Sequence, residues 1–439
     1  MATASMSETA SGEAADMAAE RPIGLSAWYA LAILTLVYTL HSVDRSVMSV
    51  VIEPVKAEFR LTDSQIGILT GLAYGCTYAI ASLPLGYLID RVERRKLLSI
   101  LVAVWSGCTA FCGIAQNYMA LLFARLAVGM AEAGGAPTSI SIISDLFPPR
   151  RRTTAISIFW ASTALGTAAS FIVGSIVAVH YGWRAAFMLA GLPGLALAAI
   201  LFFTVTEPPR EGATNRDGNR DGAPTVGETL RYALARKLFV HNFIGMTLNS
   251  MMLSGVLVWQ ASFMVRVHHL SLEHAGLLAG LAVGLFGGVG ALAGGPLGDR
   301  MYKRGGVAAL PLAAGVATFI AVMTGIVFTL SGSVLVATIS LVGFELVGRT
   351  YVGPAYSAAV GSLQPRMRGL CISAVQVATN LIGYGFGPYL AGVVSDRMGG
   401  ANGIRWGLAT LMLLGLWSCI HYVLAWRAGL RADLAAAGE

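Results

Sequence analysis

The chain has 439 residues, of which 56% are hydrophobic and 12% are charged, and its formal net charge is +7. Soluble domains carry about 25% charged residues, so this composition excludes an ordinary soluble domain and favours a membrane protein. The positive charge does not indicate nucleic-acid binding, because the basic residues lie in short loops without aromatic residues among them.

Residues 1–22 begin the chain with a polar, acidic segment. Its first twenty residues contain four acidic residues and no basic one, and they lack the apolar stretch of a signal peptide. We expect a disordered cytoplasmic tail here, and a second cytoplasmic tail at 431–439.

Apolar stretches then recur along the chain, and each is long enough to cross a bilayer as a helix, which needs ~20 residues. The stretches are continuously apolar, whereas barrel strands would alternate, so they predict helices. The twelve predicted spans are 25–51, 65–90, 96–115, 118–146, 153–180, 184–206, 239–266, 273–300, 306–330, 333–363, 368–395 and 404–428.

Ionisable residues are rare inside these spans, and they gather in spans 1, 4 and 10. An unpaired charge at the bilayer centre costs at least ~2.5–3.5 kcal/mol, so these side chains should face a cavity or one another. They are His41, Asp44 and Arg45 in span 1, Arg125 and Glu132 in span 4, and Glu345 and Arg349 in span 10.

An internal repeat divides the chain into two halves. The sequence GYLIDRVERRK (86–96) closes span 2, and GPLGDRMYKRG (295–305) closes span 8 at an offset of 209 residues. Both contain G-x-L-x-D-R, which predicts two six-helix lobes related by a pseudo-two-fold axis. The expected fold is an all-α integral membrane protein with lobes at 23–206 and 237–430, joined by a cytoplasmic linker at 207–236 that is rich in Gly, Pro and charge.

The repeated element is also a candidate cytoplasmic gate. Glycine allows two helices to approach closely, an aspartate can face a helix N-terminus, and the arginines can anchor at the membrane surface. The alternative is an ordinary helix end with flanking charges. The predicted gate residues are Gly86, Asp90, Arg91, Arg94, Asp145, Asp299 and Arg300.

Most of the 30 Lys and Arg residues fall in the terminal segments, the middle loop and the loops after spans 2, 4 and 8. Such a bias marks the cytoplasmic side of a membrane protein. We therefore expect a protein of the cytoplasmic (inner) membrane with both termini in the cytoplasm.

The twelve spans, the central division and GYLIDRVERRK resemble the major facilitator superfamily. SVDR (42–45), RLAVGMAEAGGAPTSISIISDLFPPRRRTTAISIF (125–159) and NLIGYGFGPYLAGVVSD (380–396) resemble the Spinster family and its bacterial members. The resemblance covers nearly the whole chain except the N-terminal tail and the middle loop. It implies a secondary transporter in which spans 1 and 4 flank a central cavity, with a lipid-like substrate such as a lysolipid or a sphingoid phosphate.

In that architecture Asp44 and Glu132 should approach each other across the cavity. We expect both to bind and release protons, while Arg45 and Arg125 tune them and meet an anionic headgroup. A permanent ion pair between spans 1 and 4 is the structural alternative. Two further questions stay open: His41 either assists the proton or packs, and the pair in span 10 is either functional or a structural i,i+4 pair.

Polar and aromatic residues on the remaining cavity helices suit an amphipathic substrate. The candidates are Tyr38, Asn249, Trp259, Gln260, Tyr351, Gln376 and Asn380. We expect protons as the coupling ion, no cofactor, no metal, and a monomer whose partners are the bilayer and an amphipathic or anionic substrate. A transporter of small organic anions or drugs and a non-transporting membrane receptor are the alternatives. The motifs do not indicate an enzyme.

Overall fold

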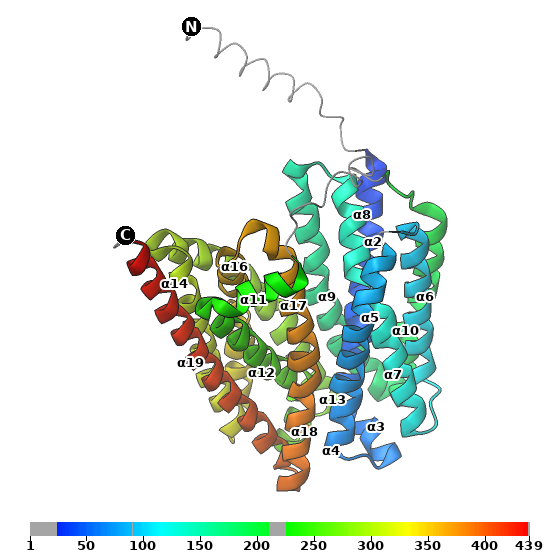
Figure 1. Cartoon of the computed structure of the whole chain (residues 1–439). Helices are drawn as coiled ribbons and strands as arrows, with labels where there is room; N and C mark the ends of the chain where they lie inside the picture. Colours follow the sequence, from blue (N-terminus) through cyan, green and yellow to red (C-terminus); the bar gives the residue numbers. More distant parts are fainter. Residues whose placement is uncertain (1–23, 90, 210–224, 438–439) are drawn as a thin grey trace.

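The structure is a computed structural model that describes residues 24–89, 91–209 and 225–437 (Figure 1). Every regular element in these ranges is a helix. The first half comprises α2 (Leu25–Val50), α3 (Ile52–Phe59), α4 (Asp63–Gly67), η1 (Ile68–Leu72), α5 (Ala73–Ile89), α6 (Arg94–Cys112), α7 (Tyr118–Glu132), α8 (Gly135–Leu146), α9 (Pro149–Tyr181) and α10 (Trp183–Thr204). The second half comprises α11 (Val226–Ala235), α12 (Lys237–His268), α13 (Leu272–Leu281), η3 (Ala282–Gly287), α14 (Gly288–Leu330), α15 (Val334–Gly348), α16 (Val352–Gly361), η4 (Pro365–Met367), α17 (Arg368–Ala378), η5 (Thr379–Phe386), α18 (Gly387–Met398) and α19 (Gly403–Ala437).

Eleven helices within the described ranges are long and apolar enough to cross a membrane. The longest, Leu272–Leu330, has 59 residues, and its backbone leaves the helical conformation at Gly305 and Gly306. Gly306 has a φ of 58°, which glycine adopts without strain, so the chain turns there and this helix makes two crossings. The prediction of an all-α membrane protein with twelve spans is thereby confirmed.

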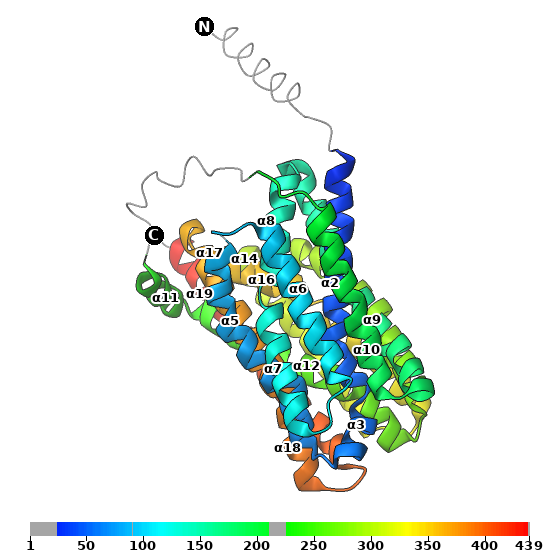
Figure 2. The same cartoon turned by 90° about the vertical axis from the view of Figure 1, so that its right-hand side faces the viewer.

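The helices pack as two groups, α2 to α10 and α12 to α19 (Figure 1). Within the first group α2 packs on α9 and α6 on α10, and within the second α19 packs on α12 and α14. The two groups meet where α4 packs on α18 and α9 packs on α13. We call the end of the bundle that carries α3 and α4 the α3 end, and the opposite end, where α8 finishes, the α8 end (Figures 1 and 2).

Two ladders of glycines bring the lobes into backbone contact toward the α3 end. A Cβ atom on Gly71 would lie 2.3 Å from the carbonyl oxygen of Gly385, and one on Gly276 would lie 2.6 Å from that of Phe171. These distances leave no room for a side chain, so glycine is required at both contacts. The ladders are Gly67, Gly71 and Gly75 against α18 and η5, and Gly276, Gly280 and Gly284 against α9. They repeat at the same offset of 209 residues as the predicted gate element.

Two predicted boundaries change. Residues 207–236 were expected to form a linker, but Val226–Ala235 within them is a helix, because Thr225 and Glu228 form a capping box at its start. The expected tail at 431–439 is helical as far as Ala437, since residues 431–437 contain neither glycine nor proline. The predicted tail at 1–22 lies outside the described residues, as do Asp90 and residues 210–224 of the linker.

A clamp at the α3 end ties α3 to α10. The Glu58 carboxylate accepts hydrogen bonds from Trp183 Nε1 and from two nitrogens of Arg184, all at 2.7 Å. The bonds from Arg184 and then from Trp183 lower the pKa of Glu58. Since a lowered pKa in the folded state favours folding only while the carboxylate is ionised, this contribution is complete at neutral pH and is lost as the pH falls through the folded-state pKa.

Glu58→Gln should therefore destabilise the protein at pH 7 by about 0.2–1 kcal/mol, the range for an exposed ion pair. The difference should shrink as the pH falls through the folded-state pKa and vanish below it, where the wild-type carboxylate is protonated in the unfolded and folded states. Thermal unfolding of both proteins in detergent at several pH values measures it. A difference that grows as the pH falls would contradict the assignment.

Candidate functional site

The site is built on α2 and α7 inside the N-terminal lobe. The side chain of Asn117 caps the start of α7 by accepting from the backbone N–H of Ala120. Gly129 lets α7 approach α5 closely, because a Cβ there would lie 2.7 Å from the carbonyl oxygen of Tyr74. This approach brings Glu132, at the end of α7, beside the polar turn of α2 that begins at His41.

His41 is the direct partner of Glu132. The distance from His41 Nε2 to Glu132 Oε2 is 3.2 Å, and the carboxylate is fully buried. The His41 ring stacks on Tyr38 at a centroid distance of 4.7 Å and meets Trp105 edge-on at 6.1 Å. Aromatic packing thus orients the imidazole toward Glu132, and Tyr38, a predicted cavity residue, supports it.

Asp44 is buried without a hydrogen-bond partner for its carboxylate. Its exposed fraction is 0%, and neither carboxylate oxygen is hydrogen-bonded to any residue that the structure describes. Arg125 contacts the backbone of Asp44 instead: Nη1 donates to the carbonyl oxygen at 3.3 Å, while Nε donates to that of Leu69 at 3.4 Å. Within the described residues, Arg125 forms no ion pair with Asp44 or Glu132, and the pair that joins α2 to α7 is His41–Glu132.

Neither of the two predicted proton-binding carboxylates reaches solvent in this conformation. Asp44, Glu132 and Arg125 are each 0% exposed. Glu132 does lie within electrostatic range of Asp44, so the two predicted proton sites are neighbours. Packing of α2, α5 and α7 covers them in this conformation.

Arg45 occupies a different place, at the interface between the lobes. Its guanidinium lies 4.8 Å from the ring centroid of Tyr74 in α5 and 4.0 Å from that of Tyr384 in η5. It is half-buried, unlike Arg125, and its Nη2 has no partner in the described part of the chain. Of the two arginines predicted to meet a headgroup, Arg45 is therefore the one between rings of both lobes.

The C-terminal lobe carries its own ion pair. Arg349 Nε and Nη2 each lie 3.1 Å from Glu345 Oε2, one helical turn away. This is the geometry of a structural i,i+4 pair, although the side chain of Arg349 remains 23% exposed. Arg349 lies within electrostatic range of Tyr384, the ring that also contacts Arg45.

Three of the other predicted cavity residues lie in α12. Asn249 and Gln260 are fully buried in α12, and their amide groups lack hydrogen-bond partners among the described residues, which is unusual for buried amides. Trp259 is buried too, but its Nε1 donates to the carbonyl oxygen of Pro388 at 2.9 Å, so it packs α12 against α18.

Three predicted cavity residues lie on or beside α16 to η5. Tyr351 is buried, Gln376 is exposed and Asn380 is half-buried. The amide nitrogen of Asn380 donates to the carbonyl oxygen of Gln376 at 2.9 Å. This bond stays within one helical stretch and does not join the lobes.

The predicted gate is not assembled in this conformation. A Cβ atom on Gly86 or Gly295 would meet no atom within 4 Å, so neither glycine contacts the other lobe. Arg91 stacks on the Tyr87 ring of its own lobe at 3.8 Å. Asp299 and Arg300 are exposed, and Asp90 lies outside the described residues.

In this conformation Arg94 and Asp145 belong to a cluster inside the N-terminal lobe. Arg94 Nη1 lies 2.5 Å from Asp145 Oδ2, and Nε lies 2.8 Å from Glu207 Oε1. Glu207 also accepts from the backbone N–H of Arg95 at 2.8 Å. Glu207 was expected in the linker, and its carboxylate is instead held near the start of α6, where the helix dipole favours an anion.

A polar lock at the α3 end joins the lobes, and the sequence did not indicate it. Arg266 of α12 donates from Nε to Glu53 in α3 at 2.8 Å and from Nη1 to Asp63 in α4 at 2.7 Å. Lys56 contacts Asp63 as well, and Ser395 Oγ donates to it at 2.5 Å.

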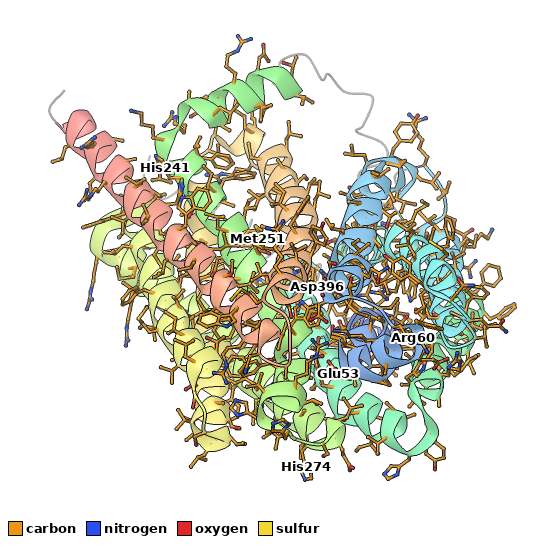
Figure 3. All side chains as sticks on the ribbon, turned by 90° about the horizontal axis from the view of Figure 1, so that it is seen from below. Glu53, Arg60, His241, Met251, His274 and Asp396 are labelled. Atoms are coloured by element: carbon orange, nitrogen blue, oxygen red, sulfur yellow. The ribbon has the colours of Figure 1, made fainter. Side chains whose placement is uncertain are left out.

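Asp396 of α18 completes the lock by capping α4 from the other lobe. Its carboxylate accepts from the backbone N–H groups of Asp63 and Ser64, both at 2.8 Å. Figure 3 views this end and shows Asp396 and Glu53 near the line where the lobes meet. The capping box Thr62–Gln65 is a signal from which the sequence could have indicated a helix start. The sequence carries no comparable signal for Asp396, the capping partner more than 300 residues away.

Two helical lobes that are locked at one end, with buried charges between α2 and α7, define a membrane transporter. The model of the Major Facilitator Superfamily matches residues 34–388, and the chain belongs to this superfamily. The chain is also similar to a solved bacterial homolog of the human lysosomal transporter Spinster in an inward-facing, unoccupied conformation. The TM-score is 0.82 at 26% identity, covering 92% of this chain and 98% of that one. The predicted Spinster resemblance is thereby confirmed.

Curated relatives extend the comparison. The chain is 25% identical to an MFS-type efflux pump of Mycolicibacterium smegmatis, over 92% of this chain and 93% of the pump. It is 26% identical to a sphingosine-1-phosphate transporter of Danio rerio, over 84% of this chain and 76% of that protein.

Proposed function

We propose that the protein is a proton-coupled secondary transporter of the cytoplasmic membrane that moves an amphipathic, lipid-like anion by alternating access. The observation that carries the proton coupling is Asp44: a fully buried carboxylate without a partner among the described side chains, beside the His41–Glu132 pair. Keeping such a carboxylate ionised in a membrane interior is costly, so the group favours binding a proton.

In this mechanism His41 and Glu132 pass a proton across their 3.2 Å contact, and Asp44 is the second acceptor. Arg125 holds the backbone of α2 at Asp44 and so positions the site without neutralising it. When the lobes separate at one end, water reaches the carboxylates and their protons exchange with that side.

The surroundings of Arg45 are the basis for proposing an anionic cargo. Its guanidinium lies between rings from both lobes, where an anionic headgroup would replace the stacking on Tyr384 and draw the lobes together. The relative that carries sphingosine-1-phosphate supports a lipid phosphate, whereas the efflux-pump relative supports a drug as the rival cargo.

The orientation follows from the basic loops. We place the α8 end and both termini in the cytoplasm and the α3 end outside, so the lock at Asp63, Arg266 and Asp396 closes the outer side. The resulting conformation is inward-facing, as is that of the solved Spinster homolog.

Counterflow in proteoliposomes tests the function. Vesicles preloaded with a lysolipid, a sphingoid phosphate, a short organic acid or a cationic drug receive a labelled trace of the same compound at two pH values. We expect labelled lipid anion to accumulate, and to depend on pH. Accumulation of the organic acid or the drug alone would reassign the cargo, and tight binding without any flux would indicate a receptor.

A further inference from the structure

Helix α11 runs across the direction of the spans. Figure 1 shows it nearly horizontal, and Figure 2 shows it at the edge of the bundle beside α19. It packs on α12 and α17, and its buried residues are Thr229 and Ala233. A helix that lies crosswise at the edge of a membrane bundle is in the position of an interfacial helix.

The apolar face of α11 is wider than the part that packs on the protein. Val226, Leu230 and Leu234 recur every four residues and so form one stripe, which we call the α11 stripe. Their exposed fractions are 66%, 52% and 61%, so the stripe is uncovered by the described part of the chain. It borders the packed face directly, because Leu230 and Leu234 each follow a buried residue.

Basic residues surround the α11 stripe. Arg231, Arg236 and Lys237 are exposed, whereas the single acidic residue of the helix, Glu228, is used in the capping box. Arg236 Nη2 donates to the Tyr232 hydroxyl at 2.6 Å, and its guanidinium lies 4.7 Å from that ring centroid. Tyrosine and arginine together suit the boundary between acyl chains and headgroups.

We propose that α11 is a membrane-interface helix that binds anionic phospholipid. The α11 stripe enters the acyl region of one leaflet, while Arg231 and Arg236 contact lipid phosphates. An aliphatic stripe edged by basic residues matches acyl chains beneath lipid phosphates. This complementarity in polarity and charge indicates that a lipid surface covers the α11 stripe. The helix thereby anchors the start of the C-terminal lobe on the membrane surface, whatever the transporter carries.

Spin-label accessibility tests this. Leu230→Cys, and separately the matched control Ala235→Cys on the opposite, exposed face, are made in the full chain with its native cysteines replaced by alanine. Each labelled protein is placed in vesicles of zwitterionic lipid with or without an anionic phospholipid. We expect the label at 230 to collide several-fold more with oxygen than with a water-soluble nickel chelate, and the label at 235 to show the reverse.

The anionic lipid should raise the oxygen preference at 230, and the double variant Arg231→Gln, Arg236→Gln should lose that increase. Equal accessibility at the two positions, or a nickel preference at 230, would overturn insertion and point to a protein partner. An unchanged signal on adding anionic lipid would overturn the phosphate contacts. Leu234→Cys, one turn further, repeats the measurement if the label at 230 disturbs the helix.

Discussion

Glu132→Gln should abolish proton-driven accumulation of the cargo and leave a folded protein that still exchanges it. Glutamine keeps the size of the side chain and can still accept a hydrogen bond from His41 Nε2, but it cannot bind and release a proton. One proton crossing 100 mV supplies ~2.3 kcal/mol, which corresponds to about 50-fold in concentration. The measurement is uptake into proteoliposomes under an imposed proton gradient, with counterflow as the readout of exchange.

Glu58→Gln is the matched control, because it makes the same replacement in the clamp at the α3 end, away from α7. It should accumulate cargo as the wild type does. If the Glu132 variant also accumulated cargo to the wild-type level, the assignment of Glu132 as a proton site would fail. Loss of counterflow in that variant as well would instead show that Glu132 is needed for movement of the lobes.

Gly71→Leu should shift the transporter away from the conformation described here. The position of its Cβ is 2.3 Å from the carbonyl oxygen of Gly385, so a leucine cannot fit while the lobes touch. Overpacking costs about 1–3 kcal/mol, which shifts a conformational equilibrium about 5- to 150-fold. Spin labels at Gln116 and Asn402, in loops at the α3 end of the two lobes, should report longer distances in pulsed resonance measurements.

Gly86→Leu offers a control on the same transmembrane span. A Cβ there meets nothing within 4 Å, so the distances at the α3 end should not change. Gly280→Leu, in the second ladder, should act as Gly71→Leu does, because its Cβ would lie 2.6 Å from Ile172 Cγ1. Wild-type distances in both ladder variants would show that the glycine contacts do not hold the α3 end closed.

The ladders and the lock act on the same end of the molecule by different means. Backbone contact at Gly71 sets how closely the lobes approach, while Arg266 and Asp396 set which residues face each other. An ion pair that loses one partner leaves a buried charge unpaired, at a cost of about 3–5 kcal/mol. Opening this end therefore requires that water or other groups replace the partners of Asp63.

The sequence identified which ionisable residues are buried in the site, but it did not predict which groups they contact. His41, Asp44, Arg125 and Glu132 stood out because ionisable residues are rare in apolar spans, and the structure gathers them between α2 and α7. Spacing along one helix did not predict that Arg125 would bind the backbone of α2, that His41 would pair with Glu132, or that the Asp44 carboxylate would have no ion-pair partner among the described residues. That outcome depends on how closely α7 approaches α5 at Gly129.

What the sequence by itself determined is the number and kind of the spans, because bilayer thickness imposes a length and a hydropathy that can be read locally. The internal repeat indicated the two related lobes, and the quoted motifs indicated the superfamily by resemblance. Only the tertiary structure decided that Gly71 meets Gly385 while Gly86 meets nothing, and that Asp396 caps a helix of the other lobe. Such contacts join residues hundreds of positions apart, and they belong to one conformation of a chain that must adopt at least two to transport its cargo.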